Sequence, residues 1–285
     1  MSYSSSCDIG HTYTKIGIFK DGNALVETNN FCGSKYFPSI IWNENNNWEF
    51  GQYIPGCIDN IKQKLVDQEN STDFLFNGKK YSAVDAVSKY ISFAYKSCEC
   101  NIQNEKTVIT IPASYTQKQR EATLAAFLKA GFNYENIQII TEPSAAALSF
   151  CLLENNKNKS FNNLVVIDSG GATTDIAIFN ISYQNGIPIF MEKYVEGNQH
   201  LGGKNIDQNL FDYVMDKLRP FGINDLDPFD DFDDIITIRK SCEEAKKKLS
   251  YSPNQIVDIL RKKAWIQGKR IPENITIDID TFETI

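Results

Sequence analysis

The residues best suited to chemistry in this chain occur in a pattern that is present twice. In the second copy, residues 164–179 read LVVIDSGGATTDIAIF, where two apolar runs flank Asp168, a glycine pair, hydroxyl side chains and Asp175. Apolar runs of this kind are typical of buried strands, and a glycine pair permits a tight turn that exposes backbone N–H groups. The pattern predicts a hairpin whose tip carries carboxylates, hydroxyls and free amides.

The groups at this predicted tip suit a phosphate and a metal ion. Amides and hydroxyls, here from Gly170, Gly171 and Thr173, bind phosphate oxygens. Carboxylates such as Asp168 suit Mg²⁺, which bridges phosphates through its waters. For a single hairpin, an ordinary tight turn without a ligand is the alternative explanation.

The first copy of the pattern makes this alternative weaker. Residues 7–19 read CDIGHTYTKIGIF, and Asp8, Gly10 and Thr14 stand in the same order and spacing as their counterparts in the second copy. Both copies are followed by a turn signal, Asp-Gly or Asn-Gly. Two copies in register predict two similar lobes, each presenting a phosphate-binding hairpin to a shared cleft.

Length and composition narrow the class of protein. The chain has 285 residues, of which 42% are hydrophobic, enough for one large domain or two lobes with a real core. Its net charge of −7 argues against nucleic acid as the main partner, because phosphate neutralisation requires clustered Lys and Arg. The seven cysteines and two histidines show no zinc spacing, and free thiols are expected. Without a signal pattern or a membrane-length apolar run, we expect a cytoplasmic protein that does not contact membranes.

The segment between the two copies predicts a sheet covered by helices. Apolar, β-branched runs at residues 107–111 and 137–140 are expected to be strands. A helix signal follows each run: Thr116 and Gln119 have the spacing of a capping box, and Pro143 suits the first turn of a helix. Alternating strands and helices indicate an α/β architecture.

Further elements follow from periodicity and turn residues. Asn155–Asn163 is polar and is expected to link the two lobes, and Asp225–Asp234 is expected to be a solvated acidic loop. Residues 255–285 alternate in places like strands. Additional helices are expected at 60–68, 84–98, 145–153, 204–218 and 235–249, with a helix ending at Gly131 and a hairpin at 74–81.

Six segments together resemble the nucleotide-binding domain of the seventy-kilodalton heat-shock chaperones, within the actin, sugar-kinase and chaperone ATPase superfamily. They are CDIGHTYTKIGIF, VITIPASYTQKQREATLAAFLKAGF, IITEPSAAALSF, VVIDSGGATTDIAIF, HLGGKNID and RKSCEEAKKKLS, in the order of the family. The resemblance implies an α/β, actin-like ATPase fold with two lobes, each a mixed β-sheet flanked by helices. Residues 1–158 would form lobe I and residues 159–285 a partial lobe II. The EPSAA form is also similar to the ribosome-associated members.

The resemblance also implies roles for the matching residues. Asp8 and Asp168 would hold hydrated Mg²⁺, and Glu142 would help to position water or the magnesium shell. Phosphoryl transfer to water depends on charge neutralisation and fixed geometry, which such residues provide. The implied catalytic residues are Asp8, Lys62, Glu142, Asp168 and Asp175; the phosphate-binding residues are Gly10, His11, Thr12, Gly170, Gly171 and Thr173; and the residues on the adenosine side are Gly202, Gly203, Glu243, Lys246, Lys247 and Ser250.

Each of these residues also has an ordinary structural explanation. The aspartates could cap turns, and Glu142 could be a structural carboxylate at a strand end. Lys62 could be a solvated helix lysine, because the segment around it aligns poorly with the family. Lys246 and Lys247 could simply favour the C-terminus of their helix.

The chain departs from the family pattern at four places. His11 stands where the family usually has a phosphate-contacting threonine, and Ala172 stands where it has a third glycine. The segment between Lys64 and Tyr81 is shorter than in the family. The closing helices and the peptide-binding domain have no counterpart here, so we expect weak nucleotide binding.

Three functions are compatible with these residues. The first is the Mg-ATP-binding and ATP-hydrolysing domain of a divergent heat-shock chaperone, with ATP or ADP and Mg²⁺ as cofactors. Its implied partners are a J-domain co-chaperone and a nucleotide-exchange factor. The second is a non-hydrolysing regulatory or ribosome-associated relative that acts as a partner-binding scaffold, an alternative favoured by His11. The third, a sugar or metabolite kinase, is disfavoured by the chaperone-like residues Glu142 and 243–250.

Overall fold

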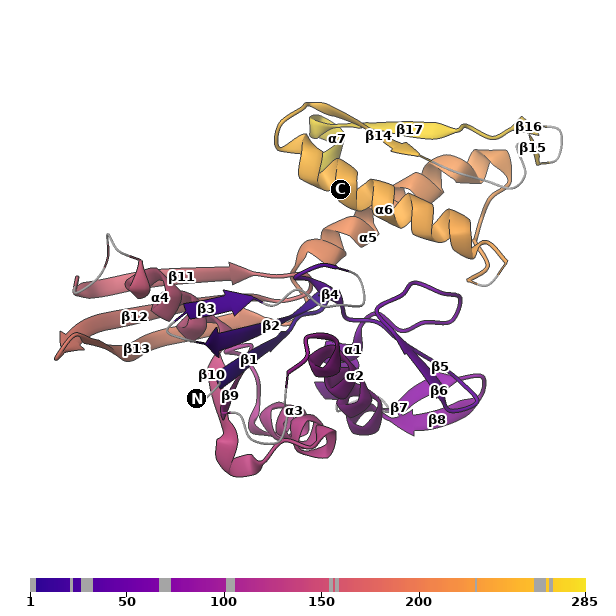
Figure 1. Ribbon diagram of the computed structural model, residues 1–285. Coiled ribbons are helices and arrows are strands. Elements are labelled where there is room, and N and C mark those ends of the chain that lie inside the picture. The colour runs from indigo at the N-terminus through magenta and orange to yellow at the C-terminus, as the bar shows by residue number, and fades with distance from the viewer. Residues whose placement is uncertain are drawn as a thin grey trace. The chain divides into compact units, whose positions relative to one another are not determined.

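The computed structural model divides the chain into two compact units, Met1–Leu201 and Gly202–Ile285 (Figure 1). It describes residues 4–20, 23–26, 33–66, 73–100, 106–153, 156, 159–228, 230–258, 265–266 and 269–285. The predicted Asp21-Gly22 turn lies outside these residues. Among the described residues, no helix is long and apolar enough to cross a membrane.

The first unit is built around a mixed sheet, as the sequence predicts. Within the described residues its strands run in the order β10-β9-β1-β2-β3, with β4 also paired to β2. The strands β1, β9 and β10 are parallel, whereas β1 and β2 form an antiparallel hairpin. The bounds are β1 Ser4–Ile9, β2 Tyr13–Lys20, β3 Asn23–Val26, β4 Phe37–Pro38, β9 Lys106–Ile111 and β10 Ile137–Thr141.

Helices and small hairpins complete this part of the first unit (Figure 1). Helix α3 begins at the predicted capping box and ends before Gly131, whose φ of 108° is the left-handed conformation that glycine favours. The core contains fully buried Tyr90, Tyr95, Ile109 and Phe127. The bounds are α1 Ile61–Val66, α2 Ala83–Ser97, α3 Gln117–Ala130 and the 3₁₀ turn η1 Tyr134–Asn136, with hairpins β5 Ile41–Glu44/β6 Asn47–Phe50 and β7 Asp73–Phe76/β8 Lys79–Ser82.

A second, antiparallel sheet carries the other copy of the hairpin pattern. Its strands are β11 Phe161–Ser169, β12 Thr174–Gln184 and β13 Ile187–Asn198, in that order. Asn185 and Gly186 connect β12 to β13 with positive φ values of 52° and 77°, as expected of a tight hairpin turn. Helix α4 (Glu142–Leu152) packs against β11 and β12, and together they form a small core of Ala147, Cys151, Ala177, Phe179 and Ile181.

The second unit has its own hydrophobic core. Helices α5 (Gly203–Leu218) and α6 (Phe232–Leu249) pack against each other, and α6 packs against β14. The buried residues include Leu210, Val214, Ile238 and Cys242. The remaining elements are η2 Arg219–Phe221, β14 Asn254–Asp258 paired with β17 Asn274–Asp278, β15 Trp265–Ile266 paired with β16 Lys269–Arg270, and α7 Ile279–Thr284.

Three local predictions need correction. Helix α6 begins at Phe232, so the predicted acidic loop ends earlier than expected, and Asp234 is buried rather than solvated. The last three residues of the predicted linker, 161–163, are already part of strand β11. The end of the chain forms the short helix α7, where alternation had suggested a strand.

Candidate functional site

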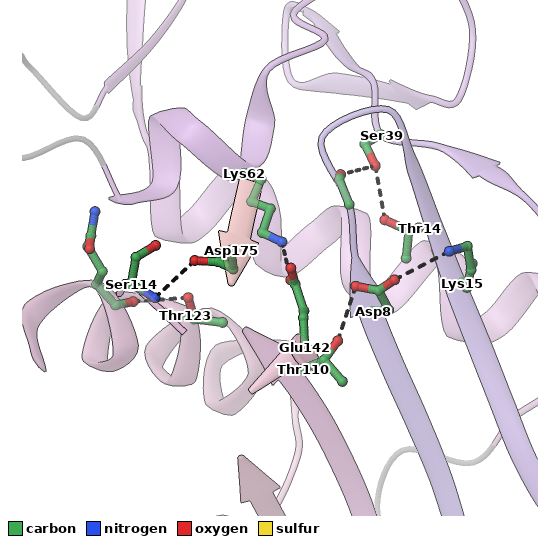
Figure 2. A network of polar contacts seen from close by, with 12 residues as sticks. Asp8, Thr14, Lys15, Ser39, Lys62, Thr110, Ser114, Thr123, Glu142 and Asp175 are labelled. Atoms are coloured by element: carbon green, nitrogen blue, oxygen red, sulfur yellow. Dashed lines mark hydrogen bonds and ion pairs between the residues drawn. The ribbon is translucent and has the colours of Figure 1, made fainter. Parts of the chain in front are cut away.

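The parallel strands of the first sheet bring several polar side chains to one edge. Asp8 in β1 lies beside Thr110 in β9, and the next strand, β10, ends at Thr141. The Thr110 hydroxyl donates a hydrogen bond of 3.1 Å to Asp8 Oδ1, and Lys15 Nζ lies 3.5 Å from Asp8 Oδ2 (Figure 2). Because the carboxyl ends of parallel strands meet at one edge, Glu142, which follows β10, lies at the same edge as Asp8.

The tip of the first hairpin is fixed by Ser39, a residue that the sequence analysis missed. The Ser39 hydroxyl donates to Gly10 O at 2.8 Å and lies 3.1 Å from the Thr14 hydroxyl (Figure 2). The Ser39 N–H donates to Thr12 O at 2.9 Å. A Cβ on Gly10 would lie 2.4 Å from Tyr13 O, so only glycine fits there. No sequence signal connects Ser39 to the hairpin, because the contact spans 25 residues or more.

The second hairpin brings two carboxylates to neighbouring positions and meets the tip of the first. Asp168 in β11 pairs directly with Asp175 in β12. A Cβ on Gly171 would lie only 2.7 Å from Thr12 Oγ1 and 3.6 Å from the Cβ of His11. The two tips are therefore in close contact, and Gly171 is needed for this approach.

A buried ion pair joins Lys62 in α1 to Glu142 in α4. Lys62 Nζ and Glu142 Oε1 are 2.5 Å apart, and the two side chains are 7% and 14% exposed (Figure 2). The Thr141 hydroxyl, which accepts a hydrogen bond from Ser144 N–H, caps α4 and fixes the position of Glu142. The structure excludes the explanation that Lys62 is a solvated helix lysine.

Burial and the neighbouring charges shift the pKa values of both partners. Burial alone lowers the pKa of Lys62, but the Glu142 carboxylate, with Tyr115 and Asp8, outweighs burial and raises it, so Lys62 stays charged. Burial raises the pKa of Glu142, and the charges of Asp8 and Asp168 act in the same direction, whereas Lys62 opposes them.

The site carries more negative than positive charge. Burial raises the pKa of Asp168, and the carboxylates Asp8 and Asp175 raise it further, while Lys62 and Lys15 lower it. Carboxylates that hinder one another's ionisation in this way are suited to a cation. Within the described residues, no group of three or more His, Cys, Asp or Glu side chains could hold a metal ion directly.

The predicted residues of the adenosine side belong to the second unit. Gly202 is the N-cap of α5, and Gly203 O accepts a 3.0 Å hydrogen bond from Lys246 Nζ. Lys246 also binds Asp207 at 2.8 Å, so it links α6 to α5. Their spacing places Glu243, Lys246, Lys247 and Ser250 on one face of α6.

One further ion pair occurs on this face of α6. Lys247 pairs with Glu243 at 2.7 Å, as expected of side chains four residues apart. Ser250 is the exposed C-cap residue of the helix.

Comparison with known proteins identifies the family. The family model described as Hsp70 protein matches residues 53–283. This chain belongs to the Hsp70 family. Its structure is that of the Hsp70 ATPase domain, an actin-like fold, as the sequence segments predicted. The first hairpin precedes the matched residues, so its inclusion in the site depends on its contact with the second hairpin.

Curated relatives support the Hsp70 assignment. A heat shock protein of Pyricularia oryzae is 26% identical over 257 residues, covering 88% of this chain and 38% of that protein. A ribosome-associated molecular chaperone of Zygosaccharomyces rouxii is 26% identical over 83% of this chain and 36% of that protein. Chaperone protein DnaK of Mycoplasmopsis pulmonis is 29% identical over 85% of this chain and 40% of that protein. The chain thus spans at most 40% of the length of these Hsp70 relatives.

Proposed function

We propose that this Hsp70-family chain binds Mg-ATP at the two hairpin tips and hydrolyses it to ADP and phosphate. The observation that carries the proposal is the contact between the tips, where Gly171 meets Thr12, beside the buried Lys62–Glu142 pair. Phosphate binding and cation binding then use neighbouring groups of one site. This is the combination that phosphoryl transfer requires.

The tips fit phosphate oxygens and a hydrated cation. Gly10 and Gly171 leave no room for a side chain, so the backbone itself lines the tips. Thr12 and Thr173 supply hydroxyls next to the side chain of His11, which is 7% exposed. Asp8 and Asp168 would hold Mg²⁺ through water, and the bound ion would neutralise charge on the phosphates.

The remaining residues of the site supply fixed charge and hold water. Lys62 remains protonated because of Glu142, so it provides a positive charge that needs no reorganisation during the reaction. Glu142 and Asp175 are the carboxylates that would orient the attacking water, and Asp175 is 1% exposed. Burial makes each of these charges more effective than it would be in water.

The wider assignments form part of the same proposal. Residues 1–158 would act as lobe I and residues 159–285 as part of lobe II, with adenosine contacts from Gly202, Gly203, Glu243, Lys246, Lys247 and Ser250. Within an intact chaperone, a J-domain co-chaperone and a nucleotide-exchange factor would control turnover. These partners are inferred from the Hsp70 family.

A second function, nucleotide binding without hydrolysis, is favoured by one observation. The His11 side chain begins where the two tips meet, with its Cβ 3.6 Å from the position of a Cβ on Gly171, and a large side chain there restricts the in-line geometry that hydrolysis needs. A relative that works through partner proteins needs only the groups that bind nucleotide and not those that carry out hydrolysis. The name of the Zygosaccharomyces rouxii relative describes ribosome association for that protein, and this association is one form of the second function.

Calorimetry followed by single-turnover hydrolysis tests both functions. We expect the chain to bind Mg-ATP, and we expect Asp168→Ala to lose the dependence of binding on Mg²⁺. Release of labelled phosphate by the wild type, absent from Asp168→Ala, supports hydrolysis. Binding without phosphate release supports the second function, and no binding contradicts both.

A further inference from the structure

Two glutamines far apart in the sequence bind each other beside the site. Gln119 lies in the first turn of α3 and is 9% exposed, and Gln199 directly follows β13. Gln119 Nε2 donates to Gln199 Oε1 at 3.1 Å, and Gln199 Nε2 donates to Gln119 Oε1 at 3.4 Å. We refer to Gln119 and Gln199 as the glutamine clamp.

The glutamine clamp holds the loop between β9 and α3. Gln199 Nε2 also donates to Ser114 O at 3.2 Å, and Gln119 Oε1 accepts from Thr116 N–H at 2.8 Å. The loop is therefore attached at two nearby backbone positions, one on either side of Tyr115. A loop held at both positions has little freedom to shift.

The same loop provides a hydrogen bond to Asp175. Ser114 N–H donates to Asp175 Oδ1 at 3.4 Å (Figure 2), so Ser114 is bound through its carbonyl to Gln199 and through its N–H to Asp175. Asp175 is 1% exposed, and a buried carboxylate without such donors would be costly. The position of this backbone N–H thus controls where the Asp175 carboxylate lies.

The end of β13 also leaves space for Asp175. Gly197 pairs with Asp175 across the sheet, and a Cβ there would lie 2.0 Å from Asp175 Oδ1 and 2.8 Å from the Cβ of Ser114. Gln199 follows only two residues later. One short segment therefore accommodates the carboxylate and fixes the loop that binds it.

We propose that the glutamine clamp positions Asp175 for the reaction, acting through the backbone of Ser114. Gln119 and Gln199 are positioning residues, because their bonds go to each other and to the loop. The inference rests on the proposed hydrolysis for its effect on rate. The structural claim, that Gln199 fixes the positions of Ser114 and Asp175, can be measured without ATP hydrolysis.

The kinetic test uses Gln199→Ala in the full chain. We expect a fall in the single-turnover rate of roughly tenfold, because small displacements of catalytic groups cost one to two orders of magnitude, with less than a twofold change in the Kd of Mg-ATP. In the Asp175→Asn background, Gln199→Ala should cause no further loss, because both changes act on the same group. Gln184→Ala, at the exposed far end of β12, is the matched control.

The structural test follows the Ser114 amide by NMR hydrogen exchange. Gln199→Ala should speed its exchange about tenfold or more and shift the Asp175 carboxylate carbon resonance, whereas Gln184→Ala should change neither. Unchanged Ser114 exchange, or a further rate loss in the Asp175→Asn background, overturns the inference. If the wild type hydrolyses no ATP, the proposed hydrolysis fails, and a faster Ser114 exchange in Gln199→Ala still supports the clamp.

Discussion

At the scale of single residues, the ion pair between Lys62 and Glu142 is much less exposed to solvent than the other ion pair of the site, Lys15–Asp8. Two charges that are almost removed from water depend on each other. Removal of one partner leaves a buried charge without compensation, whereas removal of both does not. The pair therefore matters for folding even if it also takes part in the reaction.

We expect Glu142→Ala to lower the free energy of unfolding by about 3–5 kcal/mol, because Lys62 would lose its partner. Urea denaturation measures this change. The double variant Lys62→Met/Glu142→Leu should be less destabilised than Glu142→Ala. Glu121→Ala, an exposed position on α3, is the control and should change stability by about 0.5 kcal/mol or less. Equal effects of Glu142→Ala and Glu121→Ala would contradict the buried pair.

His11 gives a second prediction at this scale. Its Cβ lies 3.6 Å from the position that a Cβ on Gly171 would take, so the side chain starts where the two tips meet. Replacement by the smaller threonine should open the tips and strengthen Mg-ATP binding about threefold to tenfold, which corresponds to roughly 1 kcal/mol. Calorimetry measures the change. Weaker binding by His11→Thr would show instead that the imidazole contributes to phosphate binding.

At the scale of elements, we predict that the stability of helix α7 depends on pH through its N-cap residue, Asp278. Hydrogen bonding by the Thr281 side chain, together with the hydrogen bond from Thr281 N–H at 2.7 Å, lowers the pKa of Asp278 below its usual 3.8. The folded chain thus binds this proton less tightly than the unfolded chain, so the cap stabilises α7 above pH 3.8 and is lost as pH falls through the lowered pKa. The Thr281 amide resonance should follow this titration. In Asp278→Asn, the side chain keeps a capping oxygen but does not titrate, so the Thr281 amide resonance should stay constant over this pH range.

The elements also show what sequence patterns can predict. The capping box at Thr116, the left-handed glycine at Gly131 and the Asn185-Gly186 turn were predicted because their signals are local. The hairpin copies were found because their residues are contiguous. Asp234 was misassigned because its burial depends on how α6 packs within its unit, which charge patterning does not report.

The site was predicted less completely than the elements. Lys62 and Glu142 were named from a family pattern, but nothing in the sequence indicated that they bind each other across 80 residues. The contacts of Ser39 and Gln199 were missed for the same reason, since both residues act through partners that are distant in the chain. Long-range pairing depends on the sheet that brings segments together, and local periodicity does not determine it.

At the scale of the whole molecule, the two units have separate hydrophobic cores. The first unit packs around residues such as Ile109 and Phe127, and the second around Leu210 and Ile238. Each core can therefore be weakened on its own. This separation is a property of the fold that short-range motifs do not reveal.

We expect Leu210→Ala to destabilise the second unit by about 2–5 kcal/mol, because it leaves a cavity in a fully buried position. Hydrogen exchange with mass spectrometry should show faster exchange in peptides of residues 202–285 and little change in those of residues 4–153. Ile109→Ala, the matched change in the first core, should give the opposite pattern. Uniform loss of protection in both variants would show that the units unfold together.

The contact between the two hairpin tips also restricts how this protein can evolve. Thr12 fills the space into which any side chain at position 171 would project, although the two positions are far apart in the sequence. A mutation at one of them changes which mutations are tolerated at the other. Lineages that enlarge residue 171 should therefore carry a smaller residue at position 12, and deep mutational scanning of paired libraries would reveal this epistasis directly.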